Sequence, residues 1–214
     1  MKVKTSISMT IYGLFVIFLA WTLGIIIPFK LTLLQALAFN IGGLLLIFVL
    51  SIILMLTALA TEELNPVIPS IFLVGFGFFN GLITHGVFFV AFRVVPIFIL
   101  VSTFGSLAGF FFIFLVAAIF IDVEEYPQTA IAILLLVLLG LGVLQLFLPF
   151  VSIYSIAIDA IVVIVFSAIL FYDLEYKKKN KEEWVSNTLN IFLDLVNIAI
   201  RIISILIKIY SESE

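Results

Sequence analysis

The sequence predicts an all-α, polytopic membrane protein that forms one domain of seven transmembrane helices over residues 1–214. Its composition is 65% hydrophobic and only 11% charged, whereas soluble domains are about 25% charged. Apolar stretches long enough to cross a hydrocarbon core of about 30 Å follow one another along nearly the whole chain. The six prolines lie at the ends of these stretches, as expected of a residue that breaks helix interiors.

The helices are placed where apolar sequence starts and stops. We expect them at residues 6–29, 34–61, 67–91, 95–121, 128–149, 152–173 and 183–210. The first follows a short basic start and is too long for the apolar core of a signal peptide, so we expect it to remain as a span. Glu62 follows the second helix, Pro66 precedes the third, Pro96 opens the fourth, and Pro127 and Pro149 bracket the fifth.

The distribution of Lys and Arg predicts a cytoplasmic N-terminus and, with seven spans, a C-terminus outside. In that orientation six basic residues lie inside and three lie outside. The inner ones are Lys2, Lys4, Lys177, Lys178, Lys179 and Lys181, and the outer ones are Lys30, Arg93 and Lys208.

Some residue types are absent or rare in the chain, and this excludes the functions that require them. The chain has no cysteine, which excludes disulfides, thiol catalysis and Cys-ligated metals. Its single histidine, His85, shares a helix row with Gly77 and Gly81, so we expect a packing residue rather than a catalytic base. No basic patch suits nucleic acid. We therefore expect neither an enzyme nor a resident cofactor.

Two predicted helices carry pairs of glycines at a spacing of four. Gly77 and Gly81 lie in the third, and Gly105 and Gly109 lie in the fourth. Small residues at this spacing let helix backbones approach closely. Both pairs therefore predict tight helix packing.

The last predicted helix carries a polar stripe in an otherwise apolar sequence. Its members follow one another at spacings of three and four, which keeps them on one helix face. They are Asn187, Asn190, Asp194, Asn197, Arg201, Ser204 and Lys208. Because ionisable groups inside a membrane are expensive, this stripe is the candidate functional surface.

A short charged loop, residues 177–183, makes the last two predicted helices an antiparallel hairpin. In an antiparallel hairpin, pairs of residues whose numbers add up to the same total lie at about the same depth. Asp173 with Asp194 and Asp159 with Lys208 have the same total, so the two residues of each pair are predicted to lie at one depth. Asp159 and Asp173 also lie within about 40° of each other on their helix. The sixth helix thus has an acidic face that can meet the stripe.

The predicted chemistry centres on Asp173 and Asp194. Two neighbouring carboxylates in a low-dielectric bundle do not both ionise cheaply, so we expect a shared proton or a bound cation. Ca²⁺ would suit these carboxylates together with the amide oxygens of Asn190 and Asn197. Alternatively, the two aspartates only pin the helices together. Arg201 is expected to act as a counter-charge or to line an aqueous vestibule.

The hairpin resembles the end of the transmembrane Bax-inhibitor motif family. Residues 165–174 (VFSAILFYDL) and 193–197 (LDLVN) are similar to the two Asp-containing segments of that family. Residues 78–81 (FFNG) and 103–106 (TFGS) look like its patterns in the third and fourth helices. The chain departs from relatives at Glu62, where bacterial members often carry a basic latch residue, and at Arg201, where they usually have no charge.

The resemblance implies a Bax inhibitor-1-like calcium leak of bacterial or archaeal type. It implies that the last helix is central and wrapped by the other six, with Asp173 and Asp194 as proton sensor and gate latch. Ca²⁺, protons and membrane lipid are the expected partners of a monomer in a prokaryotic plasma membrane.

Three other functions remain open at this point. A proton-coupled cation transporter would suit shared protons and a buried Arg201, although inverted repeats are not evident. A non-conducting membrane scaffold would act through its loops. An intramembrane aspartyl protease also uses two aspartates, but it would need a Gly-x-Gly before Asp194, where the chain has Ile191, Phe192 and Leu193.

Overall fold

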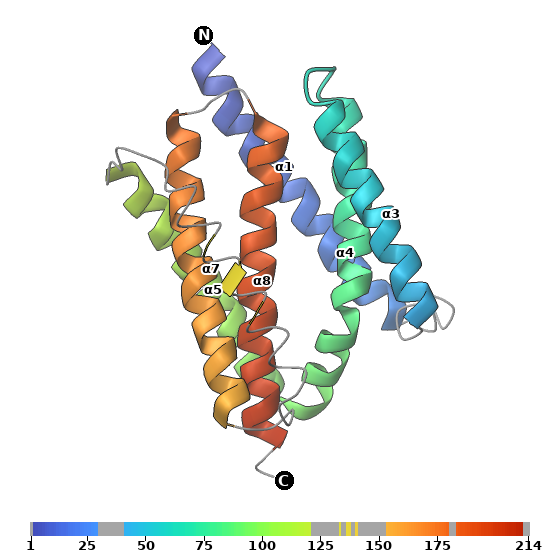
Figure 1. The fold of residues 1–214 in the computed structure, drawn as a ribbon, viewed down its shortest axis with the longest axis vertical. Helices are drawn as coiled ribbons and strands as arrows, with labels where there is room; N and C mark the ends of the chain where they lie inside the picture. Colours follow the sequence, from blue (N-terminus) through green and yellow to red (C-terminus); the bar gives the residue numbers. More distant parts are fainter. Residues whose placement is uncertain are drawn as a thin grey trace. The chain divides into compact units, whose positions relative to one another are not determined.

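The computed structural model describes residues 2–29, 41–120, 153–179 and 183–211, together with residues 133, 136, 137 and 140. These residues form six α-helices and one short 3-10 helix, which confirms the all-α prediction (Figure 1). The elements are α1 (Lys2–Ile26), η1 (Ile27–Phe29), α3 (Ile41–Ala60), α4 (Val67–Val94), α5 (Ile97–Phe120), α7 (Ile153–Lys179) and α8 (Trp184–Ser211). The predicted helix at 128–149 lies outside the described residues, apart from the four named above.

Two helices extend four or more residues beyond the ends predicted for them. Helix α1 begins at Lys2 rather than residue 6, and α7 continues to Lys179 rather than ending at residue 173. The candidate membrane span within α7 ends at Leu174, close to the prediction. The difference arises because hydropathy marks the membrane-crossing part of a helix, whereas Lys and Glu are good helix formers that continue it into water.

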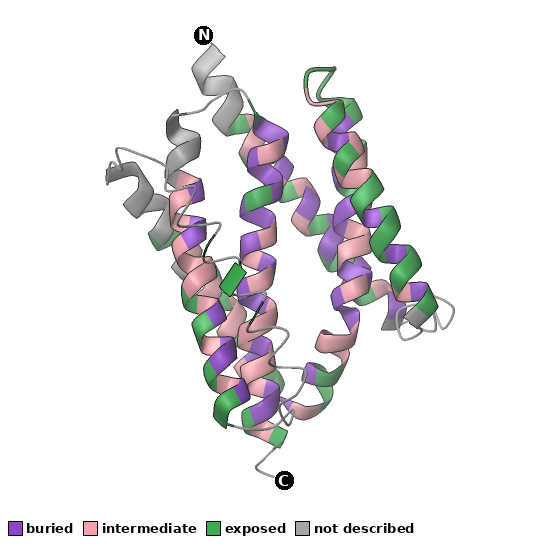
Figure 2. Ribbon diagram, in the orientation of Figure 1, coloured by how far each residue is buried: buried purple, intermediate pink, exposed green. Residues whose placement is uncertain are grey.

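Five of the described helices are long and apolar enough to cross a membrane. The candidate spans are Ser8–Ile26, Gly42–Ala60, Val67–Val94, Ile153–Leu174 and Trp184–Ser211. Helix α3 is the least buried of them, with many exposed residues along its length (Figure 2). Its exposed side chains are large and apolar, among them Leu45, Phe48 and Ile53. That is the surface expected of a helix that faces lipid.

Contacts divide the chain into two compact units. One comprises Met1–Phe89 with Asn180–Phe192, and the other comprises Val90–Lys179 with Leu193–Glu214. Helices α4 and α8 therefore contribute residues to both units. The prediction of one domain over residues 1–214 stays a prediction.

In the first unit, α1 and α4 approach through glycines. A Cβ atom on Gly81 would overlap the carbonyl oxygen of Trp21 and lie 2.8 Å from the Cα of Gly24. A Cβ atom on Gly77 would lie 2.5 Å from the carbonyl oxygen of Ile17. The glycine pair of α4 is therefore used for close packing, as predicted. In α5, by contrast, no described atom lies within 4 Å of the Cβ position of Gly105 or Gly109, so tight packing is not found there.

Polar contacts reinforce this interface between α1 and α4. Trp21 donates a hydrogen bond from Nε1 to Oγ1 of Thr84 at 3.1 Å. The fully buried His85 places Nδ1 at 2.8 Å from the carbonyl oxygen of Ile25. His85 is therefore buried in the interface between α1 and α4, on the same side of α4 as the glycine pair.

The first part of α8 packs onto the same unit through Phe192. This fully buried ring makes edge contacts with Phe18 of α1 and Phe76 of α4, at centroid distances of 5.1 and 5.9 Å. Gly13 of α1 also leaves room for Thr188, whose Oγ1 would lie 2.5 Å from an added Cβ. The apolar side of α8 is therefore held against α1 and α4.

Candidate functional site

Helix α7 and the second part of α8 lie side by side (Figure 1). A buried ion pair joins them. The Nζ of Lys208 lies 2.5 Å from Oδ2 of Asp159, and the two side chains are 1% and 0% exposed. The pairing of these residues, predicted from the sum of their numbers in the hairpin, is confirmed. A buried charge requires a partner of this kind, because an isolated one would be neutralised by gaining or losing a proton, or would destabilise the fold.

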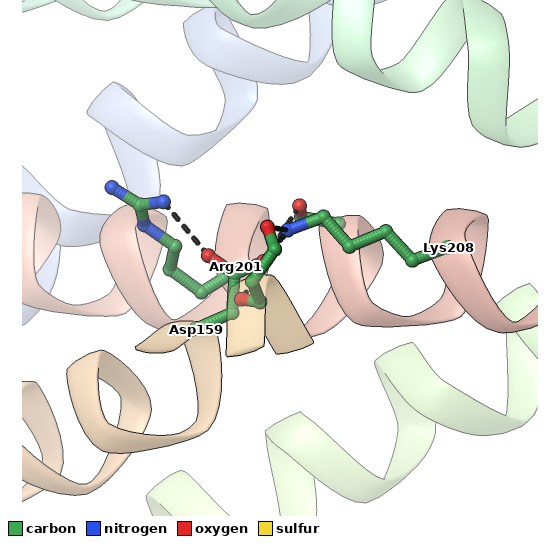
Figure 3. A network of polar contacts seen from close by, with 5 residues as sticks. Asp159, Arg201 and Lys208 are labelled. Atoms are coloured by element: carbon green, nitrogen blue, oxygen red, sulfur yellow. Dashed lines mark hydrogen bonds and ion pairs between the residues drawn. The ribbon is translucent and has the colours of Figure 1, made fainter. Parts of the chain in front are cut away.

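Asp159 is the centre of a larger network (Figure 3). Its Oδ1 accepts a hydrogen bond from Nη1 of Arg201 at 2.8 Å, and its Oδ2 accepts one from Oγ of Ser204 at 2.9 Å. Lys208 also donates to Oγ of Ser155 at 2.7 Å. One carboxylate therefore bonds to two cations and one hydroxyl group, and a second hydroxyl group, that of Ser155, bonds to Lys208.

The network bears on two expectations. Arg201 forms an ion pair with Asp159, which agrees with the counter-charge that was one of the two roles expected for it. The second expectation concerns the depth of Asp159 relative to α8. The hydrogen bond from Ser204 defines this depth more closely than the ion pair with Lys208 does, because the side chain of serine is short and that of lysine can extend along the helix. Asp159 therefore lies opposite Ser204, about one helical turn from the predicted level, and the flexible side chains of Arg201 and Lys208 reach it from either side.

Asp173 and Asp194 occupy the other end of this hairpin. They are buried, at 4% and 6% exposure, and belong to the same compact unit as Asp159. Asp173 follows Asp159 on α7 by about four turns, or about 21 Å. Extending the register indicated by Ser204 along the hairpin predicts that Asp173 and Asp194 lie within about one turn of the same depth. Their roles as proton sensor, gate and Ca²⁺ ligands stay predictions.

The three asparagine side chains of the stripe differ in how deeply they are buried. Asn187 is buried, Asn197 is half-buried, and Asn190 is exposed. At about 100° per residue, Asn190 is rotated about 40° to one side of Asp194 and Asn187 about 20° to the other. The outward position of Asn190 differs from the interior one expected for a cation ligand, whereas Asn197 keeps a position between Asp194 and Arg201.

Ser155 is the one member of the network that the sequence interpretation missed. It precedes Asp159 by four residues and therefore lies on the same face of α7. This spacing is the signal that could have identified it.

A pocket of about 450 Å³ lies in the same unit as the network. Its wall is mainly apolar and comes from α5, α7 and α8, with three small hydroxyl residues on α5. The lining includes Ser102, Thr103, Ser106, Val163, Ile198 and Ile202. Because the hydroxyl groups of Ser102 and Thr103 bond to backbone carbonyls one turn earlier, the pocket presents little polarity to an ion.

The described residues contain no group of three or more His, Cys, Asp or Glu side chains that could hold a metal ion. A Ca²⁺ site on Asp173 and Asp194 would thus need oxygens of other kinds, such as amides, carbonyls or water.

Comparison with known proteins assigns the chain to a family. A comparison with curated proteins gives no match. Residues 4–211 match the family described as "Inhibitor of apoptosis-promoting Bax1", which covers nearly the whole chain and both aspartate segments of the hairpin. Together with five helices able to cross a membrane, this match shows that the chain is an integral membrane protein and a member of the Bax inhibitor-1 family.

Proposed function

We propose that the protein is a pH-sensitive leak for cations, chiefly Ca²⁺, gated by protonation of Asp173 and Asp194. The observation that carries the proposal is the burial of both carboxylates on facing helices at one end of the α7/α8 hairpin. A buried carboxylate needs a proton, a cation or hydrogen-bond donors to compensate its charge. Protons and Ca²⁺ therefore compete for the same two groups.

The rest of the stripe provides the remainder of the proposed path. Asn197 continues it from Asp194, and the network of Asp159, Arg201 and Lys208 sets the charge of the other half. The proposal includes seven spans with α8 at the centre, a cytoplasmic N-terminus, an external C-terminus, and a monomer in a prokaryotic plasma membrane. No enzymatic step is proposed.

A proton-coupled cation transporter and a non-conducting scaffold are the alternatives, and flux measurements separate all three. The full chain is reconstituted into liposomes that contain a Ca²⁺ indicator and a pH indicator. A leak predicts Ca²⁺ entry down its gradient without a fixed number of protons moving outward. A fixed proton-to-Ca²⁺ ratio would favour the transporter, and no flux at any pH would favour the scaffold.

A further inference from the structure

The first turn of α8 is capped from a distant part of the chain. The first N–H groups of any helix lack a carbonyl partner one turn earlier and need another acceptor. At α8 the first intrahelical bond runs from N of Asn187 to the carbonyl oxygen of Glu183 at 3.0 Å. The N–H of Val185 donates instead to Oε1 of Glu62, at 2.7 Å and across 123 residues of sequence. Both belong to the same compact unit.

Glu62 is held in place by its own turn, between α3 and α4. Its N–H donates to the carbonyl oxygen of Leu59 at 3.2 Å, and the N–H of Leu64 donates to that of Thr61 at 3.0 Å. Helix α4 has a separate cap, since the N–H of Val67 donates to Oδ1 of Asn65 at 3.1 Å. The side chain of Glu62 is therefore not needed to form the turn or to start α4, and its described contact is with α8.

The surroundings of this carboxyl group oppose its ionisation. Among the side chains that the structure describes, the charged groups acting on Glu62 are Glu183 at the start of α8 and Glu63 in its own turn, and both are acidic. Burial raises the pKa of Glu62 above its usual 4.5, and the two neighbouring carboxylates raise it further, against the lowering effect of the N–H groups of Val185 and Ser186.

We propose that Glu62 positions the start of α8 as a proton-dependent clamp, which holds the helix more firmly when protonated and less firmly when ionised. A solvent-exposed, undocked Glu62 would titrate at its ordinary pKa, whereas the docked group holds its proton to higher pH. Proton binding therefore favours docking. The clamp is fully engaged below about pH 4.5 and weakens as pH rises through the higher pKa of the docked group.

This clamp goes beyond the proposed ion flux and does not depend on it. It acts on the helix that carries Asp194, whose side chain lies nine residues after Val185. A change in the first turn of α8 therefore occurs about 14 Å along the axis from the buried aspartate. The proton sensed by Glu62 is distinct from any proton shared by Asp173 and Asp194.

The test is amide hydrogen exchange of the full chain in lipid nanodiscs, expressed as protection factors from about pH 5 to about pH 8. In the parent, protection of residues 184–188 is expected to fall about fivefold across this range, the effect of weakening one helix cap. Glu62→Gln keeps the acceptor oxygen without its charge, so its protection should stay high at every pH. In Glu62→Ala, protection of residues 184–188 should be low at every pH.

Glu63→Gln is the matched control, because it removes the same charge from the adjacent, exposed residue. It should keep the falling profile, moved slightly to lower pH because Glu63 makes a small contribution to the raised pKa of Glu62. Protection in residues 200–207 of α8 reports whether each variant is folded. The proposal is overturned if Glu62→Gln and the parent share one pH profile, or if Glu62→Ala in a folded protein protects residues 184–188 as well as the parent does.

Discussion

The ammonium group of Lys208 lies 2.5 Å from a carboxylate oxygen of Asp159, and both side chains are almost completely buried. This contact joins α8 to α7 across 49 residues of sequence. It lies at one end of a hairpin whose other end carries the buried Asp173 and Asp194. Charge pairing thus joins the helices at one end, while the other end holds the two buried acids of the proposed sensor.

Breaking this ion pair from one side should destabilise the fold strongly. Asp159→Asn would leave Lys208 and Arg201 without their shared carboxylate, at an expected cost of about 3–5 kcal/mol in the free energy of unfolding. The double variant Asp159→Asn, Lys208→Met removes the buried cation as well and should recover about half of that loss. Reversible unfolding in detergent measures both values. A double variant that loses the sum of the two single effects would contradict the pairing.

Arg201 should restrict the passage of divalent cations. Arg201→Gln removes one positive charge from a network that holds two cations and one carboxylate. A unit charge about 6 Å from a divalent ion changes its energy by about 1.4 kcal/mol even at the dielectric constant of water, so the Ca²⁺ flux should rise about tenfold. Arg201→Lys keeps the charge and should stay near the parent rate. Equal flux in the parent and in Arg201→Gln would place the network outside the ion path.

The α1/α4 interface should be sensitive to one added methyl group. Gly81→Ala would press its Cβ against backbone atoms of Trp21 and Gly24, which cannot move aside cheaply. We expect a loss of about 1–3 kcal/mol in stability, typical of overpacking. Gly109→Ala is the matched control, because no described atom lies within 4 Å of its Cβ position. Thermal unfolding of both variants in the same detergent measures the two losses of stability. Equal losses would contradict a special role of Gly81 in the interface.

The sequence predicted the six α-helices that the structure describes and the ion pair of Asp159 with Lys208, because hydropathy constrains the helices and a short hairpin loop constrains the pair. It did not predict that Arg201 also reaches Asp159, since that depends on the flexibility of a long side chain and on a register one turn away. It did not distinguish Gly81 from Gly109 either. The same spacing occurs around both, and only the neighbouring helix decides whether a glycine is needed.

The central claim concerns Asp173 and Asp194, and Ca²⁺ flux into liposomes as a function of pH tests it most directly. The parent should show a pH-dependent flux, and Asp173→Asn and Asp194→Asn should each change its rate and flatten its pH profile. Glu63→Gln removes an exposed carboxylate and should leave the profile as in the parent. If both aspartate variants show the parent's flux and pH profile, the two aspartates only hold the helices together and the proposed sensor is wrong.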